Sequence, residues 1–386
     1  MSHGKLKDDL YQAVNHELEG RLALGVSKRG DRSQGLSEER IYSANTFNGY
    51  RRNSLKFAEY VAKNSPQGRF TTLEEARQYA PAYIADLKAN GYSASSLKTK
   101  ASALGKLFHC SGTEFGDTGV RHRSEIMRGR RPTKISEKTG KTIKNRSTYA
   151  GRFSEKKHPE IVSFMKATGL RKTELQRLKG TQLLHNDGPA HYAPYGEVVK
   201  LYNSVTGSDV STKNASFKVL VPSGDFLIIR GKGGRVRCAP VLQSGADLVR
   251  GKCSFAGGKK VFDKLPSNLD VHSYRDRYAQ TLYKELARDT ANLKENGKLT
   301  EINQIKDSAL KKHALEGYYQ ENVLRLLAMD PAQRAAEHPS RSEIYFCRDD
   351  LAGTHYDKLA MSAVSEALGH SRICVIAGHY LHTGVA

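Results

Sequence analysis

Residues 121–149 hold too few apolar side chains to form a hydrophobic core, and this stretch divides the chain into two folding parts. It contains ten lysines and arginines against two acidic residues. A segment of this composition buries too little apolar surface to offset the entropy lost on folding. We therefore predict an interdomain linker at residues 121–150. Its positive charge suits a strap along a polyanion, and a passive connection is the alternative.

The charge of the linker is part of a wider excess. The 386-residue chain has a formal net charge of +22, which predicts a polyanionic partner, with nucleic acid as the first candidate. A basic protein whose charge serves only solubility is the alternative. An anionic membrane surface is disfavoured, because no long basic amphipathic stretch carries tryptophan or phenylalanine anchors.

Cysteine usage and the first residues favour a reducing compartment. The five cysteines are scattered and form no C-x-x-C pair, so we predict neither a disulfide framework nor a zinc site. Residues 1–25 carry no apolar core of signal-peptide length, and no apolar run approaches a membrane span. We expect a soluble, cytoplasmic, nucleoid-associated protein.

Before the linker, the pattern predicts a compact all-α domain at residues 38–120. A capping box begins one helix at Thr72, and Asn90-Gly91 ends it. Another helix follows, with Lys98 and Lys100 off its apolar stripe. Lysines in such places are usually only solvated, but in so basic a chain they are also candidates for DNA contact.

The first residues, 1–37, predict a helix followed by a loop. Leucines and a valine recur at near-helical spacing between Leu6 and Leu18. Two arrangements stay open. The helix can be an arm-like segment, separate or swapped onto a neighbouring protomer, or it can dock on its own domain.

After the linker, residues 151–386 predict a mixed α/β domain that is mainly helical with a small antiparallel sheet. Short strands are expected at 217–221, 225–230 and 235–241, the last two joined by a glycine-rich turn. Residues 285–343 are polar and predict a helical insertion, with a turn at Asn292–Lys298 and another element starting at Asp330-Pro331. The sequence offers no purpose for this insertion.

Three short motifs in this second part carry reactive side chains. Arg171 and Glu174 stand three apart after Thr168-Gly169-Leu170, and His272 and Arg275 stand three apart at a helix start. His370 follows Leu368-Gly369, and Tyr380 lies ten residues further on. Guanidinium groups do not ligate metals, so we expect no metal site. Arginine does grip phosphate oxygens through paired charged hydrogen bonds, and a tyrosine hydroxyl is an oxygen nucleophile.

In order and context these motifs resemble the tyrosine recombinase (phage integrase) family. The resemblance covers residues 168–382 well and the first domain only in helical character and length. It implies that Arg171 and Arg275 hold the scissile phosphate and that Tyr380 attacks it. It further implies that His272 hydrogen-bonds at the same phosphate and helps to take the proton of the nucleophile. His370 would belong to the same site, and Glu174 would orient neighbouring groups. Lys232, in the turn of the predicted hairpin, stands where the family keeps the lysine that protonates the departing 5′-oxygen.

The resemblance implies a site-specific DNA recombinase, an integrase of a mobile element, that works through a 3′-phosphotyrosyl intermediate without a cofactor. Its partners would be double-stranded DNA with recombination sites, three further copies in a tetramer on paired sites, and a DNA-bending accessory protein as a further candidate. A type IB topoisomerase or telomere resolvase would use the same chemistry, and a non-catalytic DNA-binding protein is the alternative from another class. The residues expected to contact the DNA backbone are Arg121, Arg123, Arg128, Arg130, Arg131, Lys134, Lys98 and Lys100.

Two features depart from the family pattern. Ninety-four residues separate Arg275 from His370, far more than is usual, and the insertion accounts for the difference. Only six residues follow Tyr380, so we expect the contact between protomers to use the N-terminal segment or the insertion.

Overall fold

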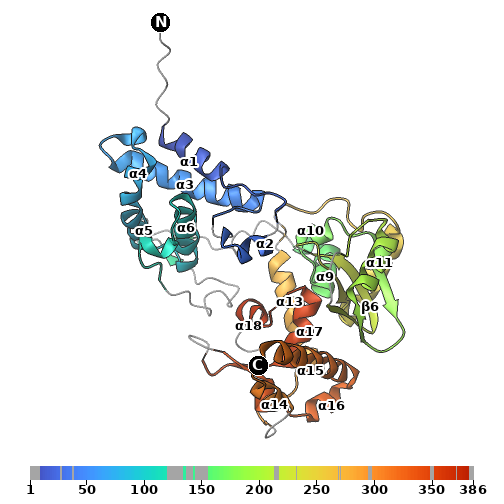
Figure 1. Cartoon of the computed structure of the whole chain (residues 1–386). Helices are drawn as coiled ribbons and strands as arrows, with labels where there is room; N and C mark the ends of the chain where they lie inside the picture. The colour runs from blue at the N-terminus through green and yellow to red at the C-terminus, as the bar shows by residue number, and fades with distance from the viewer. Residues whose placement is uncertain are drawn as a thin grey trace. The chain divides into compact units, whose positions relative to one another are not determined.

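The computed structural model describes the backbone of most of the chain and divides it into two compact units, Met1–Arg121 and His122–Ala386 (Figure 1). The described residues are 9–26, 28–36, 39–119, 134–135, 142–143, 155–212, 217–231, 233–267, 269, 271–293, 298–347, 352–370 and 372–381. None of the helices in these ranges is long and apolar enough to cross a membrane.

The first unit is helical. Its longer helices pack around Phe57, Val61, Tyr83 and Leu104, and the rings of Phe57 and Tyr83 meet edge to face at 5.5 Å. The predicted capping box at Thr72 is present, and Asn90 caps the end of the following helix. The elements are α1 (Leu10–Glu19), α2 (Lys28–Ser33), α3 (Ala44–Asn64), α4 (Leu73–Ala76), α5 (Ala80–Ala89), α6 (Ala94–Leu107) and short 3₁₀ turns at Gly68–Phe70, Arg77–Tyr79 and Gly112–Phe115.

Helix α1 docks on its own unit, which is one of the two arrangements that the sequence left open. Leu10, Val14 and Leu18 are buried in the same core as Phe57. Asp9 caps the helix through the backbone N–H of Gln12. Removing α1 would therefore expose the core of the first unit, so this helix is a poor choice for a truncation that tests assembly.

The second unit is mainly helical with small antiparallel sheets, which confirms the predicted fold class in outline. The sheets are β3-β6-β7, β4-β5, β8-β9 and β1-β2. Its strands are β1 (Lys134–Ile135), β2 (Thr142–Ile143), β3 (Leu183–Asn186), β4 (His191–Pro194), β5 (Lys218–Val221), β6 (Gly224–Arg230), β7 (Val236–Pro240), β8 (Ile344–Phe346) and β9 (His355–Asp357). The three predicted strands correspond to β5, β6 and β7.

The helices of the second unit lie between and after these strands along the chain. They are α9 (Pro159–Thr168), α10 (Lys172–Leu175), α11 (Tyr195–Thr206), α12 (Ala246–Ala256), α13 (Val271–Leu286), α14 (Lys298–Gln304), α15 (Ser308–Ala328), α16 (Pro331–Ala336), α17 (Lys358–Leu368) and α18 (Cys374–His379), with 3₁₀ turns at Glu155–Lys157, Gly180–Gln182, Gln243–Gly245 and Arg341–Glu343. Pro331 begins α16 as expected, with Asp330 in a capping box. Part of the turn predicted at Asn292–Lys298 lies outside the described residues.

The insertion is built into the core of the second unit. Helix α15 packs against α17, and Figure 1 shows the two beside each other. Val323 and Leu326 of α15 belong to the same buried cluster as Tyr278 of α13 and Leu368 of α17. The insertion therefore supports the two helices that carry Arg275 and lead into His370.

A group of buried ion pairs around Arg288, here called the ionic hub, joins α13, the insertion and α17. The Arg288 guanidinium donates from Nε and Nη2 to the two carboxylate oxygens of Asp357, at 2.7 and 2.9 Å. Its Nη1 donates to Glu337 at 3.0 Å and to Glu343 at 3.3 Å. Asp357 also caps α17 by accepting from the Leu359 backbone N–H. One arginine thus joins the end of α13, the insertion and the start of α17.

We expect Arg288→Met to lower the free energy of unfolding of the second unit by about 3–5 kcal/mol, because it leaves the carboxylates of Asp357 and Glu343 buried without their cation. Chemical denaturation followed by circular dichroism measures this loss. The control is Arg325→Met, which breaks an ion pair with Glu337 whose arginine is 47% exposed. It should cost about 1 kcal/mol or less, and equal losses in both variants would contradict the hub.

Candidate active site

The first arginine motif is placed by a close helix-to-helix contact. Helix α9 ends at Gly169, whose φ of 59° is left-handed. A Cβ atom added there would lie 2.3 Å from the ring of Tyr278 on α13. Only glycine fits this position, both for its backbone conformation and for its space. The chain then turns so that Arg171 stands at the start of α10.

Glu174 accepts four hydrogen bonds and is 2% exposed through its side chain. Its Oε1 accepts from Arg171 Nη1 at 2.8 Å and from Arg237 Nη1 at 2.9 Å. Its Oε2 accepts from the Arg171 backbone N–H at 2.8 Å and from Arg237 Nη2 at 3.0 Å. Every lone pair of this carboxylate is therefore used. Burial alone would raise the pKa of Glu174, but the charges and hydrogen bonds of Arg237 and Arg171 outweigh burial and hold that pKa at about 2.

Arg275 of α13 lies between the ends of two helices. Its Nη1 donates to the carbonyl of Gly169, at the end of α9, and its Nη2 donates to the carbonyl of Leu368, the last residue of α17. Its Nε donates to the Tyr380 hydroxyl at 3.2 Å. The side chain is almost wholly buried, at 1% exposed. Helix C-terminal carbonyls carry partial negative charge, so they stabilise this cation where water cannot reach it.

Tyr380 follows α18, and its hydroxyl meets two of the predicted site residues. Besides Arg275, His370 reaches it, with Nε2 3.1 Å from the hydroxyl oxygen. His370 is itself fixed, because its backbone N–H donates to the Ser365 carbonyl at 2.8 Å. Gln280 of α13 donates to the Tyr380 carbonyl at 3.1 Å. The sequence motifs around residues 171, 275, 370 and 380 therefore converge on one place.

The charges around His370 keep its imidazole neutral. Burial and then the positive charges of Arg275, Arg171 and Arg237 lower the pKa of His370 to about 3. Burial also lowers the pKa of Arg275, to about 10, which still leaves it protonated near neutral pH. An imidazole of so low a pKa accepts a proton from a phenol only weakly, and an anion bound at these arginines would offset their charges and raise that pKa. The site thus combines cations for an anionic group with a base for a hydroxyl group.

Comparison with known proteins concerns the first unit. Residues 33–111 match the phage integrase N-terminal SAM-like domain. The chain matches no curated protein. The match supports membership of the tyrosine recombinase, or phage integrase, family. An integrase-family domain points to a recombinase enzyme in general and to DNA as its partner.

The remaining predicted site residues lie in different settings. His272 is exposed in the first turn of α13. Lys232 lies outside the described residues. The turn that carries it does lie against the site, because a Cβ on Gly231 would be 3.1 Å from Arg237 Nη1 and 3.3 Å from Glu174 Oε1.

The residues predicted to contact DNA also lie in different settings. Lys98 is exposed on α6, whereas Lys100 is buried, with its ammonium nitrogen 5.4 Å from the ring centroid of Tyr92. Burial, followed by the charges of Lys56 and Arg52, lowers the pKa of Lys100. The linker residues outside the described structure are Arg121, Arg123, Arg128, Arg130 and Arg131, and of Lys134 only the strand backbone is described.

The sequence reading missed Arg237. Its neighbour Arg235 is exposed, whereas Arg237 is 4% exposed and binds Glu174 with two nitrogens. The sequence of β7 gave a signal, since an arginine inside an otherwise apolar strand needs a buried anion. The sequence alone did not show that Glu174 is that anion.

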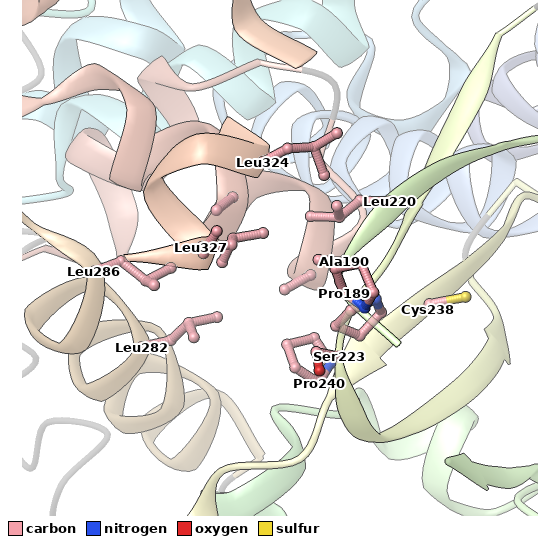
Figure 2. A pocket seen from close by; sticks show the side chains of 14 residues that line it. Pro189, Ala190, Leu220, Ser223, Cys238, Pro240, Leu282, Leu286, Leu324 and Leu327 are labelled. Atoms are coloured by element: carbon pink, nitrogen blue, oxygen red, sulfur yellow. The ribbon is translucent and has the colours of Figure 1, made fainter. Parts of the chain in front are cut away.

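An apolar pocket of about 400 Å³ lies among α13, α15 and α17 (Figure 2). Leu282 and Leu286 of α13 line one side, Leu324 and Leu327 of α15 another, and Ala367 of α17 a third. No charged residue lines it, so it offers nothing to bind phosphate. Among the described residues, no group of three or more histidine, cysteine, aspartate and glutamate side chains is placed to hold a metal ion.

The lowered pKa of Glu174 predicts an acid-sensitive contribution to stability. The pKa is depressed in the folded protein, so the contribution is full above the ordinary value of 4.5 and is lost as pH falls toward about 2. We expect the stability advantage of wild type over Glu174→Gln to shrink across this window by roughly 3 kcal/mol. Denaturation at a series of pH values measures it. The exposed Glu197→Gln is the control and should follow wild type, and an advantage independent of pH would contradict the ion-pair assignment.

Proposed function

We propose that the protein is a site-specific DNA recombinase of the integrase type, which cleaves and rejoins DNA through a covalent link to Tyr380. The observation that carries this proposal is the Tyr380 hydroxyl, held between the buried guanidinium of Arg275 and the neutral imidazole of His370. Arginine beside a tyrosine hydroxyl suits attack on a phosphodiester, since the arginine stabilises charge that builds on the phosphate oxygens.

The proposed cleavage step is a transesterification. His370 accepts the proton of Tyr380, and the phenolate oxygen attacks phosphorus, forming a 3′-phosphotyrosyl bond. The bond to the 5′-oxygen breaks, and Lys232 donates the proton that completes the 5′-hydroxyl. Arg171 and Arg275 stabilise the five-coordinate phosphorus. The reverse reaction with the 5′-hydroxyl of a partner duplex rejoins the strands, so bond energy is conserved and no cofactor is consumed.

The present arrangement fits a resting state of this site. Arg275 uses three of its five donors, on two carbonyls and the phenol, and two remain. We infer that a phosphate oxygen takes the place of the phenol at Nε when DNA binds. Arg171 is better placed to meet the phosphate first, because its side chain is 24% exposed while its Nη1 is held by Glu174.

Several finer features remain part of the proposal. The linker arginines, Lys134 and Lys98 would contact the DNA backbone, whereas Lys100 is buried in the first unit. Four copies would assemble on paired sites, since exchange between two duplexes needs four nucleophiles. A bending protein is a further candidate partner, and a mobile element is the expected genetic setting. A type IB topoisomerase or telomere resolvase would cleave one duplex without forming a four-way junction, and a non-catalytic DNA-binding protein would form no adduct.

Tyr380→Phe should abolish the covalent protein–DNA adduct on a nicked suicide substrate while DNA affinity stays within about twofold, because the change removes the nucleophilic oxygen and little else. Denaturing electrophoresis detects the adduct. The controls are Tyr345→Phe and Tyr356→Phe. Tyr356 is a good match because it is fully buried in the second unit's core. Adduct persisting in Tyr380→Phe would reject this nucleophile.

The two histidines can be separated by the same assay under single-turnover conditions. His370→Gln should slow adduct formation by about 10²–10⁴-fold, the usual effect of losing a general base. His272→Gln should slow it less if His370, whose Nε2 lies 3.1 Å from the phenol oxygen, is the base. The reverse order of the two losses would assign the base to His272.

A further inference from the structure

Arg237 occupies the point where three motifs of the second unit meet. It extends from β7 and pairs with Glu174 through both terminal nitrogens. Its Nε donates to the carbonyl of Ala367 in the last turn of α17, at 2.9 Å. The same side chain therefore fixes the acid that holds Arg171 and the helix that leads into His370.

The neighbours of Arg237 leave its side chain little room for another conformation. A Cβ on Gly369 would lie 2.9 Å from Arg237 Cδ, and one on Gly231 would lie 3.1 Å from its Nη1. These two glycines belong to the Leu-Gly-His motif and to the hairpin turn before Lys232. Their close approach is needed because the arginine side chain fills the space between them.

The electrostatic balance also depends on Arg237. Without its charge, Glu174 would pair with Arg171 alone and cancel the charge that Arg171 presents. With Arg237 present, one carboxylate is shared by two guanidinium groups, and the group of Arg171, Arg237, Arg275 and Glu174 has one more positive charge than it would have without Arg237. Among the described residues, Glu174 is the only side chain to which Arg171 donates a hydrogen bond.

We propose that Arg237 is a positioning residue. By sharing Glu174 it leaves the charge of Arg171 available to phosphate, and by holding Ala367 it aligns α17, and with it His370, for the attack of Tyr380 on phosphorus. This proposal rests on the proposed function of the site. It assigns two separable roles to one side chain, a charge that offsets Glu174 and a hydrogen bond that holds Ala367. Each role predicts a different response to substitution.

Phosphate binding tests the first role without any cleavage. Protein labelled with 3-fluorotyrosine gives a ¹⁹F resonance for Tyr380, assigned by its loss in Tyr380→Phe, which reports anions at the adjacent arginines. In wild type, titration with inorganic phosphate should shift this resonance in a saturable way. Arg237→Met should weaken that binding by about tenfold, as expected for losing one nearby charge, and Glu174→Gln in the same chain should restore it.

Adduct formation tests the second role. Arg237→Lys keeps the charge but loses the paired geometry and the reach to Ala367. It should bind phosphate within about threefold of wild type yet form adduct about 10–100-fold more slowly at saturating DNA, a loss common for residues that orient reacting groups. The Arg237→Met/Glu174→Gln chain should also stay slow. Arg235→Gln removes a charge from the same hairpin at an exposed position and should behave as wild type in both assays.

The outcomes distinguish the two levels of the argument. If Arg237→Met binds phosphate and forms adduct like wild type, the positioning role is rejected and the proposed function stands. If Arg237→Lys loses both readouts together with its folded circular dichroism signal, the role is only structural. If wild type itself shows neither a saturable phosphate shift nor a Tyr380-dependent adduct, the proposed function is rejected and the role of Arg237 falls with it.

Discussion

The shared carboxylate of Glu174 is the interaction on which the rest of the site depends. Three arginines gather here, with Arg237 and Arg275 buried and the side chain of Arg171 24% exposed. Like charges repel strongly at low dielectric, so such a group needs a buried anion. Glu174 supplies it with four hydrogen bonds, and the depressed pKa of its carboxyl, about 2, reflects that load. The remaining positive charge helps to keep His370 neutral beside the Tyr380 phenol.

The second support of the site comes from helix ends. Helices α9 and α17 both stop at a glycine in the left-handed conformation, Gly169 at φ 59° and Gly369 at φ 68°. The backbone carbonyls of Gly169 and Leu368, at these two helix ends, accept hydrogen bonds from Arg275. Backbone dipoles thus hold a cation without adding another acid. A second carboxylate in their place would cancel the charge that the site offers to phosphate.

The insertion between Arg275 and His370 has a structural explanation in this fold. It packs on α13 and α17 and is fixed to both by Arg288. Those two helices carry Arg275 and lead into His370, so these two residues lie close together in space despite the long insertion between them in sequence. The insertion holds the helices of the Arg275 and His370 motifs in place. The polar composition of residues 285–343 did not predict this.

Local rules of the chain were enough to predict much of this protein. The composition of residues 121–149 separated two parts, the glycine-bounded turn predicted the β6–β7 hairpin, and the motifs around Arg171, Arg275, His370 and Tyr380 were identified before any contact was known. These features depend on spacing and backbone preference, which are properties of short segments. The roles of Lys232 and of the linker arginines stay predictions from the sequence.

Tertiary structure decided which of these groups touch each other. It paired Glu174 with Arg237 across 63 positions of sequence, placed His370 at the Tyr380 hydroxyl, docked α1 on its own unit and buried Lys100. In each case the outcome depends on which long-range neighbour removes a side chain from water or compensates its charge. That choice is made by the packing of whole helices and strands, and no short stretch of sequence contains it.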